Sequence, residues 1–167
     1  GAGGHAGGLS PFALIQEIRS FFDGPLLLSG AIATGRAILA AQAMGADLAY
    51  IGSPFIATAE ANAVEGYKQM IVDSGADDIV NSSLFTGIHG NYLKPSIRNA
   101  GMDPDALESA DPSSMDFGKG TAKAKAWSQI WGSGQGIGAV KSVQPAAALV
   151  DRLAEEYAAA KRELCAA

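Results

Sequence analysis

The sequence is poor in cysteine, in long hydrophobic runs and in clustered positive charge. Its one cysteine, Cys165, cannot form a disulfide within the chain, which suits a reducing compartment, and we expect a cytoplasmic protein. The longest apolar run, Pro25 to Leu28 with its flanks, has the length of a strand rather than of a membrane span. Lys and Arg total 12 against 17 for Asp and Glu, and no basic stripe interleaves with aromatic residues. We therefore expect neither a membrane nor a nucleic acid as a partner.

Hydrophobic residues make up 48% of the 167 residues, which is enough for a packed core of about one domain. The chain has no initiating Met and begins inside a glycine-rich run, from Gly1 to Gly8. Because such a loop ordinarily follows a strand, we expect the chain to be a piece of a longer protein.

Helix signals alternate with strand signals over residues 1–76. Ser10 and Pro11 predict an N-cap and a first helical position, and apolar residues at three- and four-residue spacing extend this helix to about Gly24. Thr34 is placed to cap a second helix, which Gly45 closes in the left-handed conformation. A third helix is expected over residues 59–72.

Two apolar runs, at residues 25–30 and 47–52, predict strands. The first run is unbroken, which fits a strand buried on both faces of a parallel sheet. Strands and helices that alternate with short loops are typical of a parallel α/β fold. The sequence therefore predicts an α/β fold for this part of the chain.

The pattern changes from about residue 77. Residues 78–85 are consistent with a strand, 86–96 form a polar segment, and 102–120 read as a loop rich in Asp, Pro and Ser. A helix is expected over 123–131, and Pro145 opens a last helix. The expected parts are the α/β part at 1–76, an appended loop-rich and helical lid at 77–140, and a C-terminal helix at 141–167 that packs back on the first part.

Small residues follow both strands predicted in the α/β part. Gly30 and Ala31 follow the first strand, and Gly52 and Ser53 follow the second. Small residues let backbone N–H groups approach an anion, and a helix N-terminus just beyond adds partial positive charge. Either turn alone is better explained by a glycine that simply ends a strand. The two turns together, one crossover apart, favour a phosphate site of the kind found after strands 7 and 8 of (β/α)8 barrels.

His5 lies within the glycine-rich run, where no neighbouring bulk keeps its ring from a flat ligand. Its ordinary pKa, near ~6.5, suits proton transfer at neutral pH. The plainer interpretation is a solvated loop histidine, and this interpretation is stronger still for His89. Trp127 and Trp131, four residues apart, are expected to pack within the protein. We expect no metal site.

Taken in order, these segments resemble the nitronate monooxygenase family. The matching segments are 3–8, 29–36, 44–47, 51–58, 85–97 and 131–138. The resemblance runs over nearly the whole chain. It implies an FMN-dependent (β/α)8 barrel of roughly twice this length, of which this chain supplies about strands 7 and 8 within residues 1–76. The rest would form a mixed, mainly helical C-terminal appendage.

The resemblance implies an oxidoreductase that uses FMN and O2 to convert nitronates or nitroalkanes to a carbonyl compound and nitrite. It makes His5 the catalytic base above the flavin. The two turns would hold the FMN phosphate through their backbone, and the glycines before His5 would lie nearer the isoalloxazine ring. The residues implied to bind FMN are Gly3, Gly4, Gly30, Ala31, Gly52, Ser53 and Gln135.

The chain departs from the family pattern at both turns. The family usually has Gly-Gly where this chain has Gly30-Ala31, and Gly-Thr-Arg-Phe where it has 52–55. Ala31 still offers a backbone N–H and Ser53 still offers a hydroxyl. Pro54 removes both an N–H and the usual arginine, which weakens the expected phosphate binding.

Three alternatives remain open from the sequence. Flavin-dependent enoyl-acyl-carrier-protein reductases and NAD(P)H:quinone reductases share the same loop and turns, although residues 86–97 favour the nitronate branch. The third is a non-catalytic phosphate-binding or assembly piece, an inactive fragment of such an enzyme. Unpaired strand edges favour association, so a homo-oligomer is one of the expected states.

A prediction follows for the chain in isolation. Because two parallel strands are not a finished fold, we expect the chain to retain little FMN after gel filtration, measured by flavin absorbance. Stoichiometric, stably bound flavin on a monomer would contradict this expectation.

Overall fold

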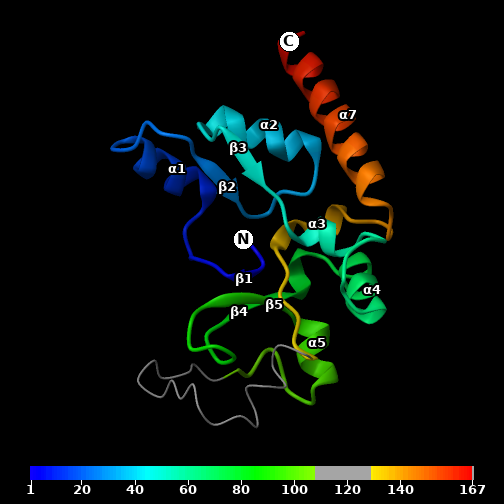
Figure 1. Ribbon diagram of the computed structural model, residues 1–167. Helices are drawn as coiled ribbons and strands as arrows, with labels where there is room; N and C mark the ends of the chain where they lie inside the picture. Colours follow the sequence, from blue (N-terminus) through cyan, green and yellow to red (C-terminus); the bar gives the residue numbers. More distant parts are fainter. Residues whose placement is uncertain (108–128, 167) are drawn as a thin grey trace.

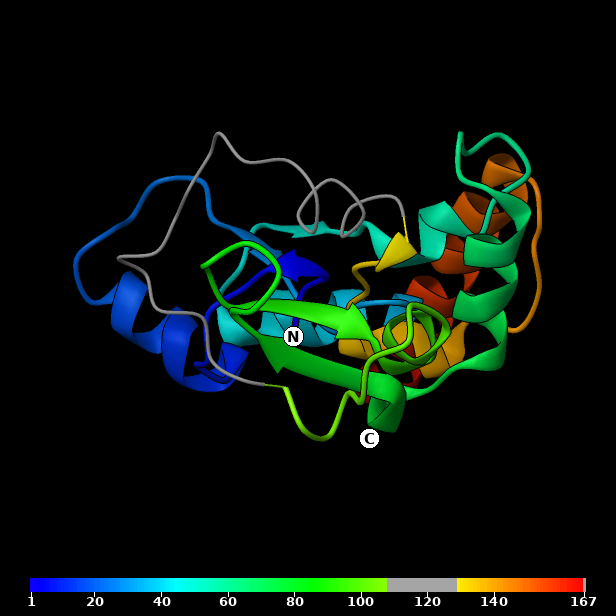
Figure 2. The same ribbon diagram turned by 90° about the horizontal axis from the view of Figure 1, so that it is seen from below.

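The computed structural model describes residues 1–107 and 129–166 and contains two small sheets (Figure 1). Strands β2 (Leu27–Ser29) and β3 (Leu48–Tyr50) form a parallel pair. Strands β1 (Gly4–His5), β4 (Ile79–Ser82) and β5 (Gly90–Leu93) form an antiparallel sheet in the order β1-β5-β4. Figure 2 shows β4 and β5 side by side.

Helix α1 (Pro11–Arg19) begins where the sequence predicts but ends before the expected Gly24, and helix α2 (Gly35–Met44) begins and ends where predicted. The Ser10 hydroxyl accepts from the backbone N–H of Phe12 at 3.3 Å, so an N–H that the helix cannot satisfy is capped. Gly45 closes α2 with a φ of 110°, a conformation that disfavours any residue with a Cβ. The α/β expectation for this part of the chain is confirmed.

An ion pair fixes how β2 enters the sheet beside β3. Arg19 at the end of α1 contacts the Asp47 carboxylate at 2.7 Å and donates to the Gly45 carbonyl at 2.9 Å. The same carboxylate accepts from the Leu26 N–H at 2.7 Å. The Leu26 N–H, followed by Arg19, lowers the pKa of Asp47 below its usual range. Asp47 thus ties together the starts of β2 and β3.

One face of the parallel pair is covered by the helices that the structure describes, and the other is open. Leu28 packs with Ile15 and Ala41 from α1 and α2. The side chains of Leu27, Leu48 and Tyr50 are 52%, 57% and 65% exposed. Successive strand residues point to opposite faces, and the described helices lie on only one of them. The expectation that β2 is buried on both faces is therefore wrong for this chain.

The helix expected over 59–72 begins later than predicted. After the short helix α3 (Ser53–Ile56), helix α4 spans Glu65–Asp73. The segment before α4 pairs with a distant part of the chain instead: the Ala59 N–H donates to the Gln144 carbonyl at 3.0 Å, and the Gln144 N–H donates to Ala57. These long-range backbone hydrogen bonds replace the helical hydrogen bonds that were expected here. Nothing in the neighbouring sequence indicates them.

The polar segment at 86–96 contains a strand that the sequence did not predict. Strand β5 is buried at all four positions and pairs with β4 on one side and β1 on the other. Helix α5 (Lys94–Asn99) follows it directly, and the short 3-10 helices η1 (Ala76–Asp78) and η3 (Gln135–Ala139) lie against one another. The loop expected at 102–120 and the helix expected at 123–131 lie largely outside the described residues.

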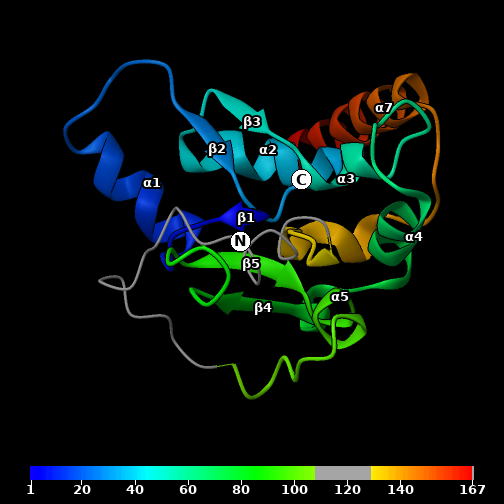
Figure 3. The same cartoon turned by 60° about the horizontal axis from the view of Figure 1, so that its bottom comes forward.

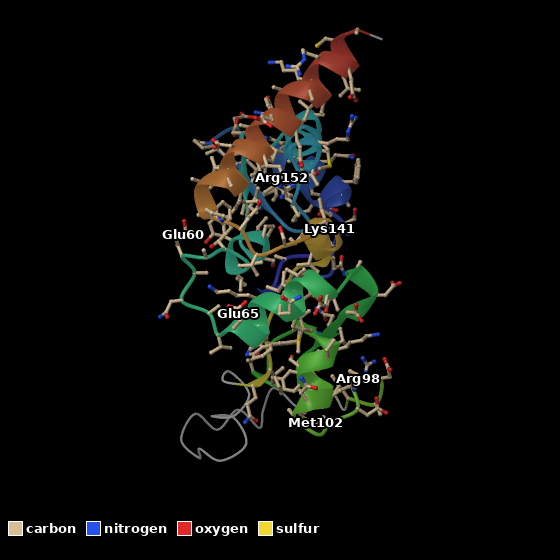
Figure 4. All side chains as sticks on the ribbon, turned by 90° about the vertical axis from the view of Figure 1, so that its right-hand side faces the viewer. Glu60, Glu65, Arg98, Met102, Lys141 and Arg152 are labelled. Carbon is tan, nitrogen blue, oxygen red and sulfur yellow. The ribbon has the colours of Figure 1, made fainter. Side chains whose placement is uncertain are left out.

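The last helix, α7 (Ala146–Cys165), packs along α2. Leu149 and Leu153 are buried in this contact, whereas Leu164, predicted on the same face, is exposed. Two distant carboxylates cap the helices: Glu60 accepts from the Ala146 N–H at 2.9 Å and Glu156 from the Gly35 N–H at 2.7 Å. Figure 4 shows Glu60 near the start of α7 and Arg152 further along it.

Gly35 is required by the close approach of α7, which gives a testable prediction. A Cβ added there would lie 2.1 Å from the Tyr157 backbone nitrogen and 2.3 Å from the Leu153 carbonyl oxygen. We expect Gly35→Ala to lower the free energy of unfolding by about 1–3 kcal/mol, measured by urea denaturation. Gly66→Ala is the matched control, because an added Cβ there meets only the Trp131 ring, at 3.5 Å. Equal stabilities of the two variants would contradict the packing argument.

Candidate functional site

A cavity of about 360 Å³ is lined by the ends of the parallel strands and by the start of β1. Figure 3 shows β1 between the parallel pair and β5. This volume is within the range of about 300–1,000 Å³ that is usual for small-molecule sites. Its lining includes Gly3, Gly4, Gly30, Gly52 and Ser53, five of the residues predicted to bind FMN. The structure therefore brings both strand-end turns and the glycine-rich loop to one place.

The strand register explains why the two turns meet. Leu27 pairs with Leu48 and Ser29 pairs with Tyr50, so the two parallel strands end level with each other. Gly30 follows β2 directly, and Gly52 lies two residues beyond β3. Carboxyl ends of neighbouring parallel strands share one edge of a sheet, which is where ligands bind in α/β proteins.

Within the described residues, neither the backbone conformation nor crowding requires a glycine at Gly30 or Gly52. Neither has a positive φ, and a Cβ added at either would meet nothing within 4 Å. Both nevertheless line the cavity. A side chain at either position would project into space that a ligand could fill, so their bareness fits the close approach of a bound group to the main chain.

Gly3 is small for a different reason. A Cβ added there would lie 2.9 Å from backbone atoms of both Ser133 and Gly134. The glycine-rich loop thus packs directly on this later segment. The Gly134 N–H also donates to the Ser53 hydroxyl at 2.8 Å. Because this bond uses a lone pair of Ser53, the hydroxyl proton of Ser53 remains able to donate to an anion.

The N-terminus of α2 does not support the expected phosphate site. The sequence predicted that the start of a helix just beyond Gly30 adds partial positive charge to the phosphate site at the two turns. Instead, the Glu156 carboxylate accepts from the Gly35 N–H and pairs with Arg152 at 2.6 Å. A carboxylate already occupies this end of α2, so any anion at Gly30 and Gly52 would rely on the turns themselves.

Ala31 and Gln135 do not line this cavity. They lie together in a second cavity, of about 520 Å³, that is also lined by Asn81 and Asn91. The two residues are neighbours because η3 packs on the turn: a Cβ on Gly136 would lie 2.8 Å from the Ala31 backbone carbon. The structure therefore separates two of the predicted cofactor residues from the other five.

His5 lies on β1, at the edge of the antiparallel sheet. It pairs with Gly90 of β5, and its side chain is exposed. Its Nε2 lies 2.8 Å from the Thr86 hydroxyl. The preceding residues Gly3 and Gly4 line the first cavity, whereas His5 is absent from its lining. His5 thus follows two residues of the cavity wall in the sequence, and its Nε2 lies against the Thr86 hydroxyl.

Tyr67, which the sequence did not mark, and Trp131, which it assigned to packing, form another wall of the cavity. The rings of Tyr67 and Trp131 stack with centroids 4.9 Å apart and planes 16° apart. The Tyr67 hydroxyl donates to the Gly132 carbonyl. Ile56 and Ile130 complete an apolar side of the cavity, opposite in character to the bare main chain at the turns. The one signal in the sequence for a role of Trp131 beyond packing was its place at the start of the matched segment 131–138.

Comparison with known proteins assigns the chain to a family. The family model described as nitronate monooxygenase matches residues 1–156. The chain belongs to the nitronate monooxygenase family. This membership confirms the resemblance stated from the sequence.

Curated relatives of the nitronate monooxygenase family match over most of this chain. A nitronate monooxygenase of Paraburkholderia phytofirmans is 32% identical over 171 residues, which cover 93% of this chain and 46% of that protein. A nitronate monooxygenase of Neurospora crassa is 26% identical, with 93% of this chain and 46% of that protein covered. The chain thus spans about half the length of the curated relatives it matches.

Solved structures show a similar α/β fold. A nitroalkane oxidase from Streptomyces ansochromogenes matches with a TM-score of 0.73 and 30% identity, over 98% of this chain and 51% of that one. FabK from Thermotoga maritima matches with a TM-score of 0.75 and 22% identity, over 99% and 54% of the two chains. At 22% identity, the second likeness concerns the fold alone.

Within residues 1–107 and 129–166, no three His, Cys, Asp or Glu side chains are grouped to hold a metal ion. Among the same residues, no helix combines the length and the apolar character needed to cross a membrane.

The half-buried side chain of Tyr67 gives a pH prediction. Burial raises the pKa of Tyr67 to about 12, so the fold favours the neutral phenol. Its contribution to stability is complete below its ordinary pKa of 10 and is lost as pH rises through about 12. We expect Tyr67→Phe to remove the last step of the tyrosinate absorbance titration, whereas Tyr50→Phe leaves it. A last step that persists in Tyr67→Phe would assign the raised pKa to another group.

Proposed function

We propose that this chain forms the FMN-phosphate-binding part of an enzyme that oxidises alkyl nitronates or nitroalkanes with O2 to a carbonyl compound and nitrite. The observation that carries the proposal is the shared cavity of Gly30 and Gly52, two glycines with no steric or conformational need of their own. Membership in the nitronate monooxygenase family supports the reaction class. In this proposal β2 and β3 are about strands 7 and 8 of a (β/α)8 barrel.

The residues of the cavity fit FMN by their chemistry. Main-chain N–H groups at the two turns and the Ser53 hydroxyl would hold the phosphate, which needs donors and no intervening bulk. Gly3 and Gly4 would lie nearer the flat ring system. Ala31 and Gln135, in the neighbouring cavity, would border the cofactor or substrate beyond the first wall. Bound FMN would supply the redox chemistry, which no protein side chain provides.

The chain's own side chains would serve the proton and the apolar part of the substrate. In this proposal His5 takes the α-proton of a neutral nitroalkane, or orients a nitronate that is already ionised. The stacked pair of Tyr67 and Trp131 would exclude water and contact apolar groups. The small-molecule substrate and O2 are the partners that this chemistry requires.

The open face of the parallel pair bears on activity. Leu27, Leu48 and Tyr50 are more than half exposed there, so this face would need further strands to cover it. We therefore propose that the chain alone is inactive and that the enzyme containing it works in the cytoplasm. Pairing of these faces between copies is a route to a homo-oligomer.

A reductase on the same barrel remains the alternative function, since enoyl-acyl-carrier-protein and quinone reductases share the glycine-rich loop and the turns. Oxygen uptake with a nitronate, against NAD(P)H oxidation with a quinone or an enoyl thioester, separates these activities in the enzyme that contains this chain. Nitronate-dependent oxygen uptake supports the proposal. NAD(P)H oxidation without it would replace the proposal with the reductase.

Filling the cavity from one turn should weaken FMN binding without unfolding the protein. We expect Gly30→Val to raise the Kd for FMN about tenfold or more, measured by flavin fluorescence titration, because its side chain enters the space proposed for the ligand. Gly75→Val is the matched control, since a Cβ on Gly75 also meets nothing within 4 Å and Gly75 is not among the cavity's lining residues. Equal FMN affinity for the two folded variants would contradict the assignment of this cavity.

A further inference from the structure

Asn91 is a buried polar residue at the centre of the antiparallel sheet. It lies on β5, is 2% exposed, and pairs with Asn81 of β4 across the two strands. Two residues along the same strands, the corresponding pair of Ile79 and Leu93 is apolar. An apolar side chain at a buried strand position needs no hydrogen-bond partner, whereas a buried amide costs free energy unless it has one. The reason for an asparagine here must therefore lie in the contacts that its amide makes.

The Asn91 amide ties the glycine-rich loop to the sheet. Its N–H donates to the Ala2 carbonyl at 2.7 Å, and its oxygen accepts from the Asn81 amide at 3.0 Å. Since a carbonyl oxygen can only accept, the Ala2 contact fixes which end of the Asn91 amide faces the loop. The main chain of Asn91 meets the loop as well, because Asn91 pairs with Gly4 in the strand register. One residue of β5 thus holds the loop on both sides of Gly3.

The segment that Asn91 holds is a wall of the first cavity. Ala2, Gly3 and Gly4 all line the cavity of about 360 Å³, and Asn91 is not among its lining residues. Asn91 instead borders the second cavity, of about 520 Å³. It therefore acts on the first cavity through the loop, without touching what that cavity would bind.

The loop needs an anchor between its ends. Main-chain hydrogen bonds fix the ends themselves: the Gln135 N–H donates to the Gly1 carbonyl at 2.9 Å, and the Ala6 N–H donates to the His89 carbonyl at 3.1 Å. The glycines between these ends have no side chains to hold them, and a glycine has more conformational freedom than any other residue. A side-chain bond at Ala2 reduces the number of positions that the wall can take.

We propose that Asn91 is a positioning residue that holds the Ala2–Gly4 wall in place for the flat ring system of bound flavin, and not for its phosphate. The anchoring concerns the protein alone; its effect on flavin rests on the function proposed above. In that function the phosphate lies at the two turns of the parallel pair, whereas Asn91 belongs to the other sheet. Because a preorganised wall lowers the cost of binding, a loosened wall weakens binding of the ring and leaves the contribution of the phosphate unchanged.

Nitrogen-15 NMR relaxation of the chain without flavin tests the anchor. We expect Asn91→Leu to lower the backbone order parameters of Gly3 and Gly4 from about 0.85, typical of a rigid backbone, to below about 0.6. Asn81→Leu is the matched control, because it also removes one hydrogen bond of the Asn91 amide and keeps the bond to Ala2. Similar midpoints of urea denaturation for the two variants would separate a loosened loop from a weakened fold. Equal order parameters in the two variants would overturn the proposal.

Asn91→Asp is a second variant, whose result does not depend on how a leucine packs. The carboxylate has nearly the shape of the amide and can still accept from Asn81. At about pH 8, far above the ordinary aspartate pKa of about 3.9, it has no proton to donate to Ala2. We expect the same loss of order at Gly3 and Gly4. A loop that stays rigid in this variant would contradict the anchor.

Two flavins separate the ring from the phosphate in the enzyme that contains this chain. We expect Asn91→Leu to raise the Kd of riboflavin and that of FMN by the same factor, about tenfold relative to Asn81→Leu, so that the ratio of the two constants is unchanged. Gly30→Val should change this ratio, because Gly30 lies at a turn proposed to hold the phosphate.

The outcomes distinguish this inference from the proposed function. Equal Kd values for Asn91→Leu and Asn81→Leu, or a changed ratio in Asn91→Leu, would overturn the role of Asn91 toward the ring. If the unsubstituted enzyme binds neither flavin, the proposed function is refuted together with that role. The order parameters then decide by themselves whether Asn91 anchors the loop.

Discussion

The parallel pairing of β2 with β3 is the constraint on which the site depends. Three residues from each strand pair in register, and the Asp47 carboxylate, held by the Leu26 N–H and Arg19, fixes where that register starts. With the start fixed, the strands end level, and the turns at Gly30 and Gly52 reach the same cavity. A slip of one residue would turn every side chain to the opposite face and separate the turns.

The remaining walls come from parts of the chain that are distant in sequence. The Leu93 N–H donates to the Trp131 carbonyl at 2.8 Å, and the Ser133 N–H donates to the Asn91 carbonyl at 3.2 Å. These bonds lay the segment around Gly132 against β5, where it meets the glycine-rich loop and Tyr67. The antiparallel sheet therefore positions the aromatic wall of the cavity, and the parallel pair positions the two turns.

Structural features that depend on neighbouring residues could be predicted from the sequence. Features that depend on contacts between distant residues could not. Caps such as Thr34, the closing Gly45 and the small residues after each strand act within a few positions, and the structure has them where they were expected. Strand β5, the late start of α4 and the Glu156 carboxylate at the start of α2 depend on partners far along the chain. A polar segment such as 86–96 shows no hydrophobic alternation, so its pairing could not be inferred.

The central claim is that two bare turns at one sheet edge recognise a phosphate. Comparing the Kd of FMN with that of riboflavin, which carries the same ring system without the phosphate, tests this claim most directly. We predict that FMN binds at least about tenfold more tightly than riboflavin, a difference of about 1.4 kcal/mol, and that this difference shrinks as salt is added. Equal affinities for the two flavins would contradict it.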